Sequence, residues 1–349
     1  MTDFDTLARA ATQELLERSV PDTTSWYADL RRTRIRRTTT SLVAVAAAVG
    51  LTVGGWQLLG SQNRPVEPAP QPGSVRNGVL LGLASHVDDP ASAWRPVDGE
   101  QPQHLPLEPA GFVQYQFTSS GDEVVYADRW DNISALSLST GDKRKLGDCL
   151  DDICAAALSP SGSTIASTDG EQVRLQSATS GVVSYLAAPG SGLLGAPAWS
   201  PDGTALAFVG AQGLYVVTVS SGEVRLVVSN PLPGTVTGPV SWSPASGTVA
   251  YFVARPERVD GYDETAYTAT AVDLATGATT PLLDAGHCFC AGVPAPSLTW
   301  SPDGTVIAVT TTTDGGKSTG VYVVRPDGSH AERVKIGLYA ALAWQPLTD

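Results

Sequence analysis

The sequence is short of the residues on which most enzymes and nucleic-acid-binding proteins depend. It has 4 histidines, 4 cysteines, 1 methionine and 7% aromatic residues, and its 22 Lys and Arg stand against 35 Asp and Glu. The net charge of -13 argues against nucleic acid as the main partner, since such proteins present basic patches. The G-x-S-x-G elbow, the H-E-x-x-H helix and the phosphate-binding loop are all absent from the sequence, so neither a catalytic centre nor a cofactor is predicted.

Glycine and proline are abundant instead, with 35 and 25 copies in 349 residues. Such a turn-rich composition fits many short strands better than long helices. The length suits one large β architecture or two unequal pieces.

One uncharged stretch, residues 41–59, separates two parts of different charge. The first 40 residues hold seven Arg and six acids, whereas residues 61–349 hold 15 basic and 29 acidic residues, a net charge of -14. At about 1.5 Å rise per residue, a helix over 41–59 spans roughly 28 Å, close to the thickness of a bilayer core. Five arginines in 30–37 precede it, so the positive-inside rule predicts a cytoplasmic N-terminus and an extracytoplasmic body.

Two other interpretations of this stretch remain. A cleaved signal peptide fits less well because the segment before it is about 40 residues long and no A-x-A-like site follows. A buried core helix is the second alternative, since the segment is only modestly hydrophobic. After the stretch, four prolines within residues 60–75 predict a semi-rigid spacer, and the body then covers 76–349.

Residues 1–38 are expected to form a short helical segment. Phe4, Leu7, Ala11 and Leu15 lie on one helical face, and Pro21 ends that helix. A solvated or membrane-surface helix is one interpretation, and a docking site for a cytoplasmic protein is the other. The segment resembles the cytoplasmic tails of actinobacterial membrane proteins that bind sigma factors.

A block of about ten residues recurs along the body. Three full copies carry Trp199, Trp242 and Trp300, each followed by Ser-Pro, a Gly-containing turn and an alternating strand. Weaker or truncated copies occupy 117–126, 157–166 and 343–346. The spacings between equivalent positions are 41, 41, 43, 58 and 44 residues, and a period near 40–45 is typical of a four-stranded β-propeller blade.

The chemistry of the block supports a tight turn, because Pro presets φ and Gly adopts the left-handed conformation. We expect the tryptophans, including Trp344, to pack between blades rather than to form a binding cage. A second set of small turns gives an independent count of six: Asp98-Gly99, Thr140-Gly141, Ser180-Gly181, Ser221-Gly222, Thr276-Gly277 and Asp327-Gly328.

The two counts are offset at the ends of the body. The first small turn has no Trp block before it, and the last Trp block has no strands after it. The C-terminus is therefore expected to complete a blade whose other strands are 79–83, 91–97 and 103–107, which leaves no open sheet edge. The sequence predicts an all-β fold, a six-bladed β-propeller closed by its N- and C-terminal strands in one blade, preceded by a short α-helical segment and one transmembrane helix.

With these repeats, the body resembles the TolB-like, WD-type six-bladed propellers. The resemblance covers about residues 76–346, and a transmembrane anchor stands where TolB has an α/β domain. It implies a protein-docking role at one mouth of the central channel.

Acidic residues gather in the segments predicted to lie opposite the short repeat turns, where function on a rigid scaffold usually sits. The candidate binding residues are Asp88, Asp89, Asp128, Asp131, Asp151, Asp152, Asp260, Asp263 and Glu264. The last three belong to a segment, 255–264, that is expected to form a long loop. Such a rim suits a basic protein patch or a divalent cation, although the acids also serve solubility. No calcium-binding loop motif is present, so no metal site is predicted.

The four cysteines form two close pairs, Cys149 with Cys154 and Cys288 with Cys290. An even number outside the cytoplasm favours disulfides, for which three connectivities exist. We predict local pairing because the two blades concerned lie opposite each other across the ring. A redox switch at the strained Cys-x-Cys pair, or a soft-metal site with His287, are the alternatives.

The sequence therefore predicts a non-enzymatic, membrane-tethered extracytoplasmic platform for a protein or an envelope polymer, with signalling through the cytoplasmic helix as a further expectation. It would be a single-pass protein of the cell membrane. The alternative is an extracytoplasmic propeller enzyme acting on a glycan or lactone with channel carboxylates. Channel acids with a raised pKa would favour the enzyme, and acids dispersed around the rim would favour binding.

Overall fold

The computed structural model describes residues 75–84, 92–94, 103–105, 107, 115–128, 132–149, 155–168, 172–186, 194–259, 262–288, 296–313, 318–334 and 338–348. The chain divides into two compact units, Met1–Val66 and Glu67–Asp349, and all described residues lie in the second. The predicted segment 1–38, the predicted transmembrane helix 41–59 and residues 60–74 of the predicted spacer lie outside them. Among the described residues, no helix is long and apolar enough to cross a membrane.

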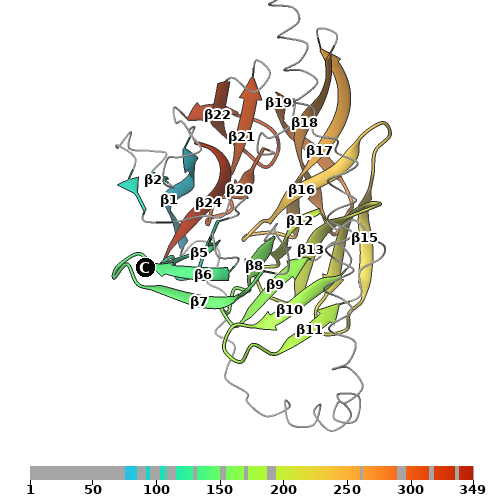
Figure 1. Ribbon diagram of the computed structural model, residues 1–349. Helices are drawn as coiled ribbons and strands as arrows, with labels where there is room; N and C mark the ends of the chain where they lie inside the picture. The colour runs from blue at the N-terminus through green and yellow to red at the C-terminus, as the bar shows by residue number, and fades with distance from the viewer. Residues whose placement is uncertain are drawn as a thin grey trace, which may run out of the picture. The chain divides into compact units, whose positions relative to one another are not determined.

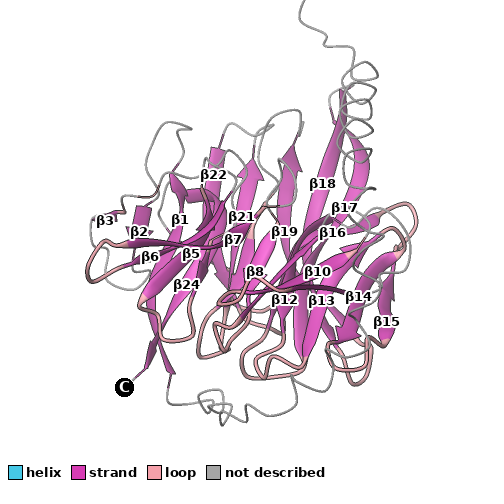
Figure 2. Ribbon diagram, turned by 60° about the horizontal axis from the view of Figure 1, so that its bottom comes forward, coloured by secondary structure: helices cyan, strands magenta, loops and turns pink. Residues whose placement is uncertain are grey.

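The described part consists of strands and contains no helix, as Figure 2 shows. One sheet joins the two ends of the described part in the order β24-β1-β2-β3. Its strands are β1 (Val75–Ala84), β2 (Ser92–Trp94), β3 (Gln103–His104) and β24 (Leu338–Thr348). Leu80 of β1 pairs with Trp94 on one side and with Trp344 on the other. The prediction that the C-terminal strand shares a sheet with three N-terminal strands is confirmed.

Three further sheets each hold four strands that are consecutive in the chain. The first contains β4 (Gln116–Phe117), β5 (Glu123–Ala127), β6 (Asn132–Ser137) and β7 (Lys143–Asp148). The second contains β8 (Ala156–Leu158), β9 (Thr164–Thr168), β10 (Val173–Ser177) and β11 (Val183–Leu186). The third contains β12 (Leu194–Trp199), β13 (Ala205–Gly210), β14 (Gly213–Thr218) and β15 (Val224–Ser229).

The fifth sheet has eight strands. They are β16 (Thr235–Trp242), β17 (Thr248–Val259), β18 (Tyr262–Asp273), β19 (Thr279–Cys288), β20 (Leu298–Trp300), β21 (Ile307–Thr313), β22 (Ser318–Val324) and β23 (Glu332–Val334). β16–β19 and β20–β23 are two antiparallel runs, and one parallel residue pair, Gly286 with Thr312, joins them. The described part therefore has five sheets where the repeat predicts six blades, because this pair merges two runs.

The core lies between neighbouring sheets. One cluster contains Leu175 of β10 and Phe208 of β13, and another contains Tyr267 of β18 and Trp300 of β20. Each cluster buries the inner faces of two successive runs of strands, which is how stacked sheets stabilise one another. The fold is an all-β propeller (Figure 1).

The predicted glycine turns are found in both sets, except that Gly247 of the Trp242 copy does not adopt a positive φ and Gly99 lies outside the described residues. Gly203 and Gly304 have φ values of 71° and 72°, and their N–H groups donate to the carbonyls of Ser200 and Ser301 at 2.9 and 2.8 Å. In the second set, Gly222 has a φ of 69°. Residues with a Cβ resist this left-handed conformation, which explains the recurrence of glycine.

The repeated tryptophans connect successive runs of strands. The indole N–H of Trp199 donates to the carbonyl of Ala157 at 3.1 Å, and that of Trp300 donates to the carbonyl of Ser241 at 3.2 Å. Each acceptor directly precedes the Trp position of the preceding repeat. In these two repeats the indole therefore combines core packing with one specific hydrogen bond to the preceding run of strands.

The repeat at 157–166 has Leu158 at the Trp position and so lacks an indole donor. Here the side chain of Gln116, in the preceding sheet, makes the hydrogen bonds that connect the two sheets. Its side-chain amide accepts from the Leu158 N–H at 2.7 Å and donates to the Leu158 carbonyl at 2.8 Å. As expected, Trp300 and Trp344 are buried, and Trp242 packs partly buried against the core.

The segment 255–264 differs from the prediction. It was expected to be a long loop, but β17 and β18 pair continuously from Thr248–Asp273 to Val259–Tyr262. Asp260 and Gly261 lie between the two strands in the sequence, and an Asp-Gly pair is a strong hairpin signal. The charged residues of this segment are therefore held in a regular two-stranded register.

Ring closure is tested by alanine at two glycines with the same φ of 75°, Gly121 and Gly141. A Cβ on Gly121 would overlap the carbonyl oxygen of Pro346 in β24, whereas a Cβ on Gly141 meets nothing within 4 Å. Gly141→Ala should lower the free energy of unfolding by about 1 kcal/mol, from the left-handed backbone alone. Gly121→Ala should lose about 1–3 kcal/mol more through overpacking. Equal losses in urea denaturation would contradict this contact between β24 and the β4–β5 turn.

The indole connection is tested by Trp300→Phe, with Trp242→Phe as the matched control, because the Trp242 indole makes no hydrogen bond among the described residues. The first substitution leaves the Ser241 carbonyl without its indole donor. We expect it to reduce the free energy of unfolding by about 1–2 kcal/mol more than the control. If urea denaturation gives similar losses of unfolding free energy for the two variants, the indole hydrogen bond does not contribute and packing alone accounts for the effect.

Candidate functional site

The structure places the predicted site residues in two groups. Asp128, Asp263 and Glu264 are described, together with Cys149 and Cys288. The remaining candidates lie outside the described residues: Asp88, Asp89, Asp131, Asp151, Asp152, Asp260, Cys154 and Cys290.

The connections at the two ends of the strands are of different kinds. The turns at Gly121, Gly203 and Gly304 lie at one end, which we name the turn face. Asp128 follows the far end of β5, and the β17–β18 connection follows the far end of β17. We name this opposite end the loop face.

Asp128 closes the connection between β5 and β6. Its carboxylate accepts from the Asn132 backbone N–H at 3.1 Å, from the Asn132 amide at 3.1 Å and from the Ser134 hydroxyl at 2.9 Å. The residue is half-buried. Because these donors come from the same sheet, Asp128 stabilises its own loop.

β17 and β18 extend beyond both neighbouring strands. β16 pairs with β17 only as far as Ala254, and β19 pairs with β18 only from Thr265 onwards. Past these points, within the described part of the chain, β17 and β18 pair only with each other. We name this segment the ribbon (residues 255–264). Figures 1 and 2 show the ends of these two strands projecting from the loop face.

The register divides the ribbon into two faces. Arg258 lies opposite Asp263, and both are exposed. Glu257 lies opposite Glu264, and Glu264 is buried, with 8% of its surface exposed. Adjacent residues of a strand point to opposite sides, so Asp263 and Glu264 do not belong to one acidic surface. Glu257 is the residue that sequence reasoning did not select, and the Asp-Gly hairpin signal would have aligned it with Glu264.

The described cysteines lie at two places on the loop face. Cys149 follows β7 and is disulfide-bonded, and Cys288 ends β19 opposite Thr265, at the base of the ribbon. Both predicted pairings involve a residue outside the described part, so they stay predictions.

The turn face carries aspartates that hold their own turns. Burial by itself would raise the pKa of Asp303, but hydrogen bonds from the Ser301 hydroxyl at 2.6 Å and from Thr305 outweigh it and lower the pKa. Asn77 of β1 also donates to Asp303, at 2.9 Å. Asp202 is arranged in the same way and its pKa is likewise lowered.

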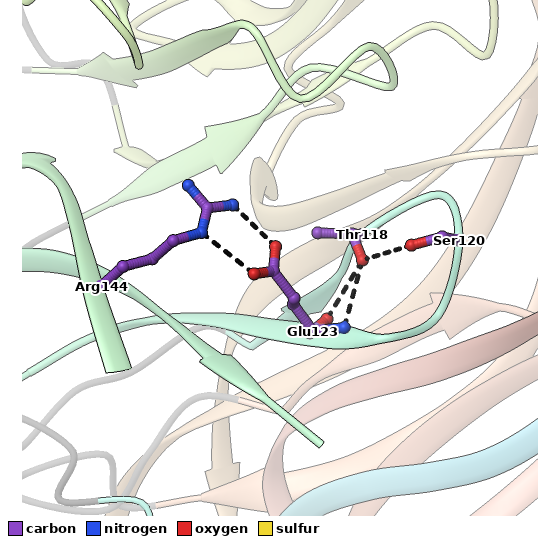
Figure 3. A network of polar contacts seen from close by, with 4 residues as sticks. All are labelled: Thr118, Ser120, Glu123 and Arg144. Carbon is purple, nitrogen blue, oxygen red and sulfur yellow. Dashed lines mark hydrogen bonds and ion pairs between the residues drawn. The ribbon is translucent and has the colours of Figure 1, made fainter. Parts of the chain in front are cut away.

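The first turn of the β4–β7 sheet uses an ion pair instead (Figure 3). Arg144 donates to Glu123 through Nε at 3.0 Å and through Nη2 at 2.7 Å, and the Glu123 N–H donates to Thr118 Oγ1 at 3.3 Å. The hydrogen bonds from Arg144 lower the pKa of Glu123 despite its partial burial. This arrangement satisfies its own charges, so the turn face has a structural role at this position.

Groups of three or more His, Cys, Asp or Glu side chains able to hold a metal ion are not found among the described residues. No protein family matches the chain, and no curated protein matches it.

Solved structures with a similar fold are found. A chain in the crystal structure of a nidogen/laminin complex has a TM-score of 0.52 and 14% identity, over 77% of this chain and 98% of that chain. A putative TolB from Agrobacterium tumefaciens has a TM-score of 0.51 and 15% identity, over 79% and 92%. Kuenenia stuttgartiensis hydrazine synthase is more distant, with a TM-score of 0.44, 14% identity and coverage of 69% and 71%. At these identities the likeness shows the fold alone, a β-propeller related in shape to TolB.

The pKa of Asp303 predicts how stability depends on pH. Its folded-state pKa lies below the ordinary value of about 3.9, so the unfolded chain binds the proton more readily. The stabilisation is complete above the unfolded value and is lost as the pH falls through the folded value. Asp303→Asn should therefore be less stable than the wild type at pH 7, and the difference should shrink towards pH 2 in thermal melts. The exposed Asp142→Asn variant is the control, and a difference that persists at pH 2 would contradict the proposed origin.

Proposed function

We propose that the chain is a non-enzymatic, membrane-tethered β-propeller of six blades that binds a protein partner through its loop face. The observation that carries the proposal is the ribbon, a charged hairpin that projects from a rigid scaffold. Binding residues commonly lie on such projections, while the scaffold fixes their position.

Six blades follow if β16–β19 and β20–β23 are counted separately. Each run begins with a strand that ends in the repeated Trp-Ser-Pro block, at Trp242 and Trp300. The Trp300 bond to Ser241 connects the two runs in the same way as the Trp199 bond to Ala157 connects two separate sheets. A single residue pair between β19 and β21 therefore marks a contact between blades.

The proposed membrane tether is inferred from the amino-acid sequence. The uncharged residues 41–59 follow five arginines, and the positive-inside rule then orients residues 1–38 to the cytoplasm and the propeller to the outside. A role of 1–38 in signalling through a cytoplasmic partner belongs to the same proposal. In this oxidising location we expect the local disulfides Cys149 with Cys154 and Cys288 with Cys290.

A protein is the favoured kind of partner. The acidic loop residues and the net charge of -14 over residues 61–349 favour a basic surface and would accelerate its association. The similar nidogen chain was solved in a complex with laminin, which agrees with a protein-binding use of this fold.

The partner is tested by photo-crosslinking in intact cells. A photoreactive residue replaces Asp263 on the ribbon, and a control replaces Val182, which is 64% exposed beside the Gly181 turn on the turn face. We expect a specific protein adduct from position 263, identified by mass spectrometry, and none from position 182. Equal or absent adducts at both positions would refute the loop-face partner.

The topology is tested separately with protoplasts. Added protease should remove the propeller from intact protoplasts, while an epitope tag before residue 38 should be protected until the membrane is opened. Protection of the propeller would contradict the outward orientation.

A further inference from the structure

Arg174 is a buried cation at the interface between two sheets. It lies in β10 with 9% of its surface exposed. Its Nη1 donates to the main-chain carbonyl of Asp148, the last residue of β7, at 3.1 Å. Among the described residues, the buried Nε–H has no hydrogen-bond partner and no carboxylate forms an ion pair with the guanidinium. A bond to a carbonyl does not neutralise the charge, and buried charges in proteins are normally paired.

Alternate residues of β10 face different neighbouring sheets. Val173 and Leu175 pack in a cluster with β13 and β14 of the following sheet. Arg174 and Gln176 therefore point the other way, towards the preceding β4–β7 sheet. The Oε1 of Gln176 would lie 2.8 Å from a Cβ on Gly147 of β7, and this buried oxygen also lacks a hydrogen-bond partner within the described part of the chain. Both groups thus lie beside the end of β7.

Arg144 shows what one edge of a guanidinium binds. Nε and Nη2 lie on the same edge, and in Arg144 they donate at 3.0 and 2.7 Å to the two carboxylate oxygens of Glu123. In Arg174 the bond from Nη1 to the Asp148 carbonyl holds the guanidinium, and the edge with Nε contacts no acceptor of the described residues. The Asp148 carboxylate forms an ion pair with Lys145 instead. A side chain held in advance loses less conformational entropy on binding.

The guanidinium lies near the loop face. β9 runs from the turn at Gly162 to Thr168, so β10 begins at the loop face, and Arg174 is its second residue. Asp148 ends β7 at the same face. A ligand that approaches the loop face therefore meets this interface at its end.

We propose that Arg174 binds a carboxylate from outside the chain through its Nε and Nη2. Paired donors in a planar fork match the two oxygens of a carboxylate, and such charge-assisted bonds are among the strongest hydrogen bonds in proteins. The Oε1 of Gln176 can accept from a water molecule or from an N–H of the same ligand. The site lies in other sheets than the ribbon, so it goes beyond the proposed function. Its ligand is either a free small carboxylate or an acidic side chain of a protein.

The first test uses acetate in thermal melts of the full-length protein, with chloride as the reference anion at the same ionic strength. A ligand that binds only the folded state raises the melting temperature. We expect acetate to raise that of the wild type and not that of Arg174→Gln. Arg225→Gln is the matched control and should respond like the wild type. Arg225 also donates to a carbonyl outside its own sheet, that of Leu274, but its side chain is exposed.

The second test measures binding of a fluorescent peptide, Gly-Gly-Glu-Gly-Gly with blocked ends, by anisotropy at low salt. The reference peptide has Gln in place of Glu. Arg174→Gln should weaken binding of the Glu peptide by about tenfold or more, as expected for lost charge-assisted hydrogen bonds. Arg225→Gln should change it by less than about twofold. Arg174→Lys keeps the charge without the two-donor edge, so it should also weaken binding, and it serves if Arg174→Gln does not fold.

The two tests separate the sources of the carboxylate. Stabilisation by acetate supports a free small carboxylate, whereas binding of the Glu peptide without an effect of acetate supports an acidic side chain of a protein. The proposal is wrong if neither acetate nor the Glu peptide binds, or if the Gln peptide binds equally well. It is also wrong if Arg225→Gln weakens binding as much as Arg174→Gln, or if Arg174→Lys binds like the wild type.

Discussion

The pairing of β24 with β1 is the constraint on which the whole propeller depends. The pairing extends from Val75 opposite Thr348 to Ala84 opposite Leu338, and without it β1 and β24 would each present an unpaired edge. It also has consequences at both neighbours. Gln345 of β24 donates to the Gly121 carbonyl of the next sheet at 2.8 Å, and Asn77 of β1 donates to Asp303 of the preceding turn at 2.9 Å. Hydrogen bonds among three sheets therefore hold the ring closed.

The two faces use polar residues for different purposes. At the turn face, hydroxyl and amide groups satisfy Asp202 and Asp303 within a few residues, so charge serves local conformation. At the loop face, Asp128 behaves similarly. The charged residues of the ribbon lie instead along two long strands that extend past their described neighbours, β16 and β19.

Sequence reasoning predicted what depends on local chemistry. Gly203 and Gly304 were predictable because few other residues tolerate a positive φ. The closing sheet was predictable because the first small turn has no Trp block before it and the last Trp block has no strands after it, so the C-terminus had to supply the missing strand. The ribbon was not recognised, since its charged residues lack the apolar alternation that marks a half-buried strand. The different environments of Asp263 and Glu264 depend on strand phase, which a shift of one residue reverses. Contacts between repeats, such as that of Gln116 with Leu158, depend on three-dimensional packing.

The adjacency of Val75 and Thr348 has one more consequence. The two ends of the propeller lie side by side in one sheet, so a short peptide linker could join them covalently. New termini could then be opened at an exposed turn such as the one at Gly141, where no neighbouring atom lies within 4 Å of an added Cβ. Such a circular permutant would keep every strand neighbour, and hydrogen bonds alone would no longer have to hold the ring closed.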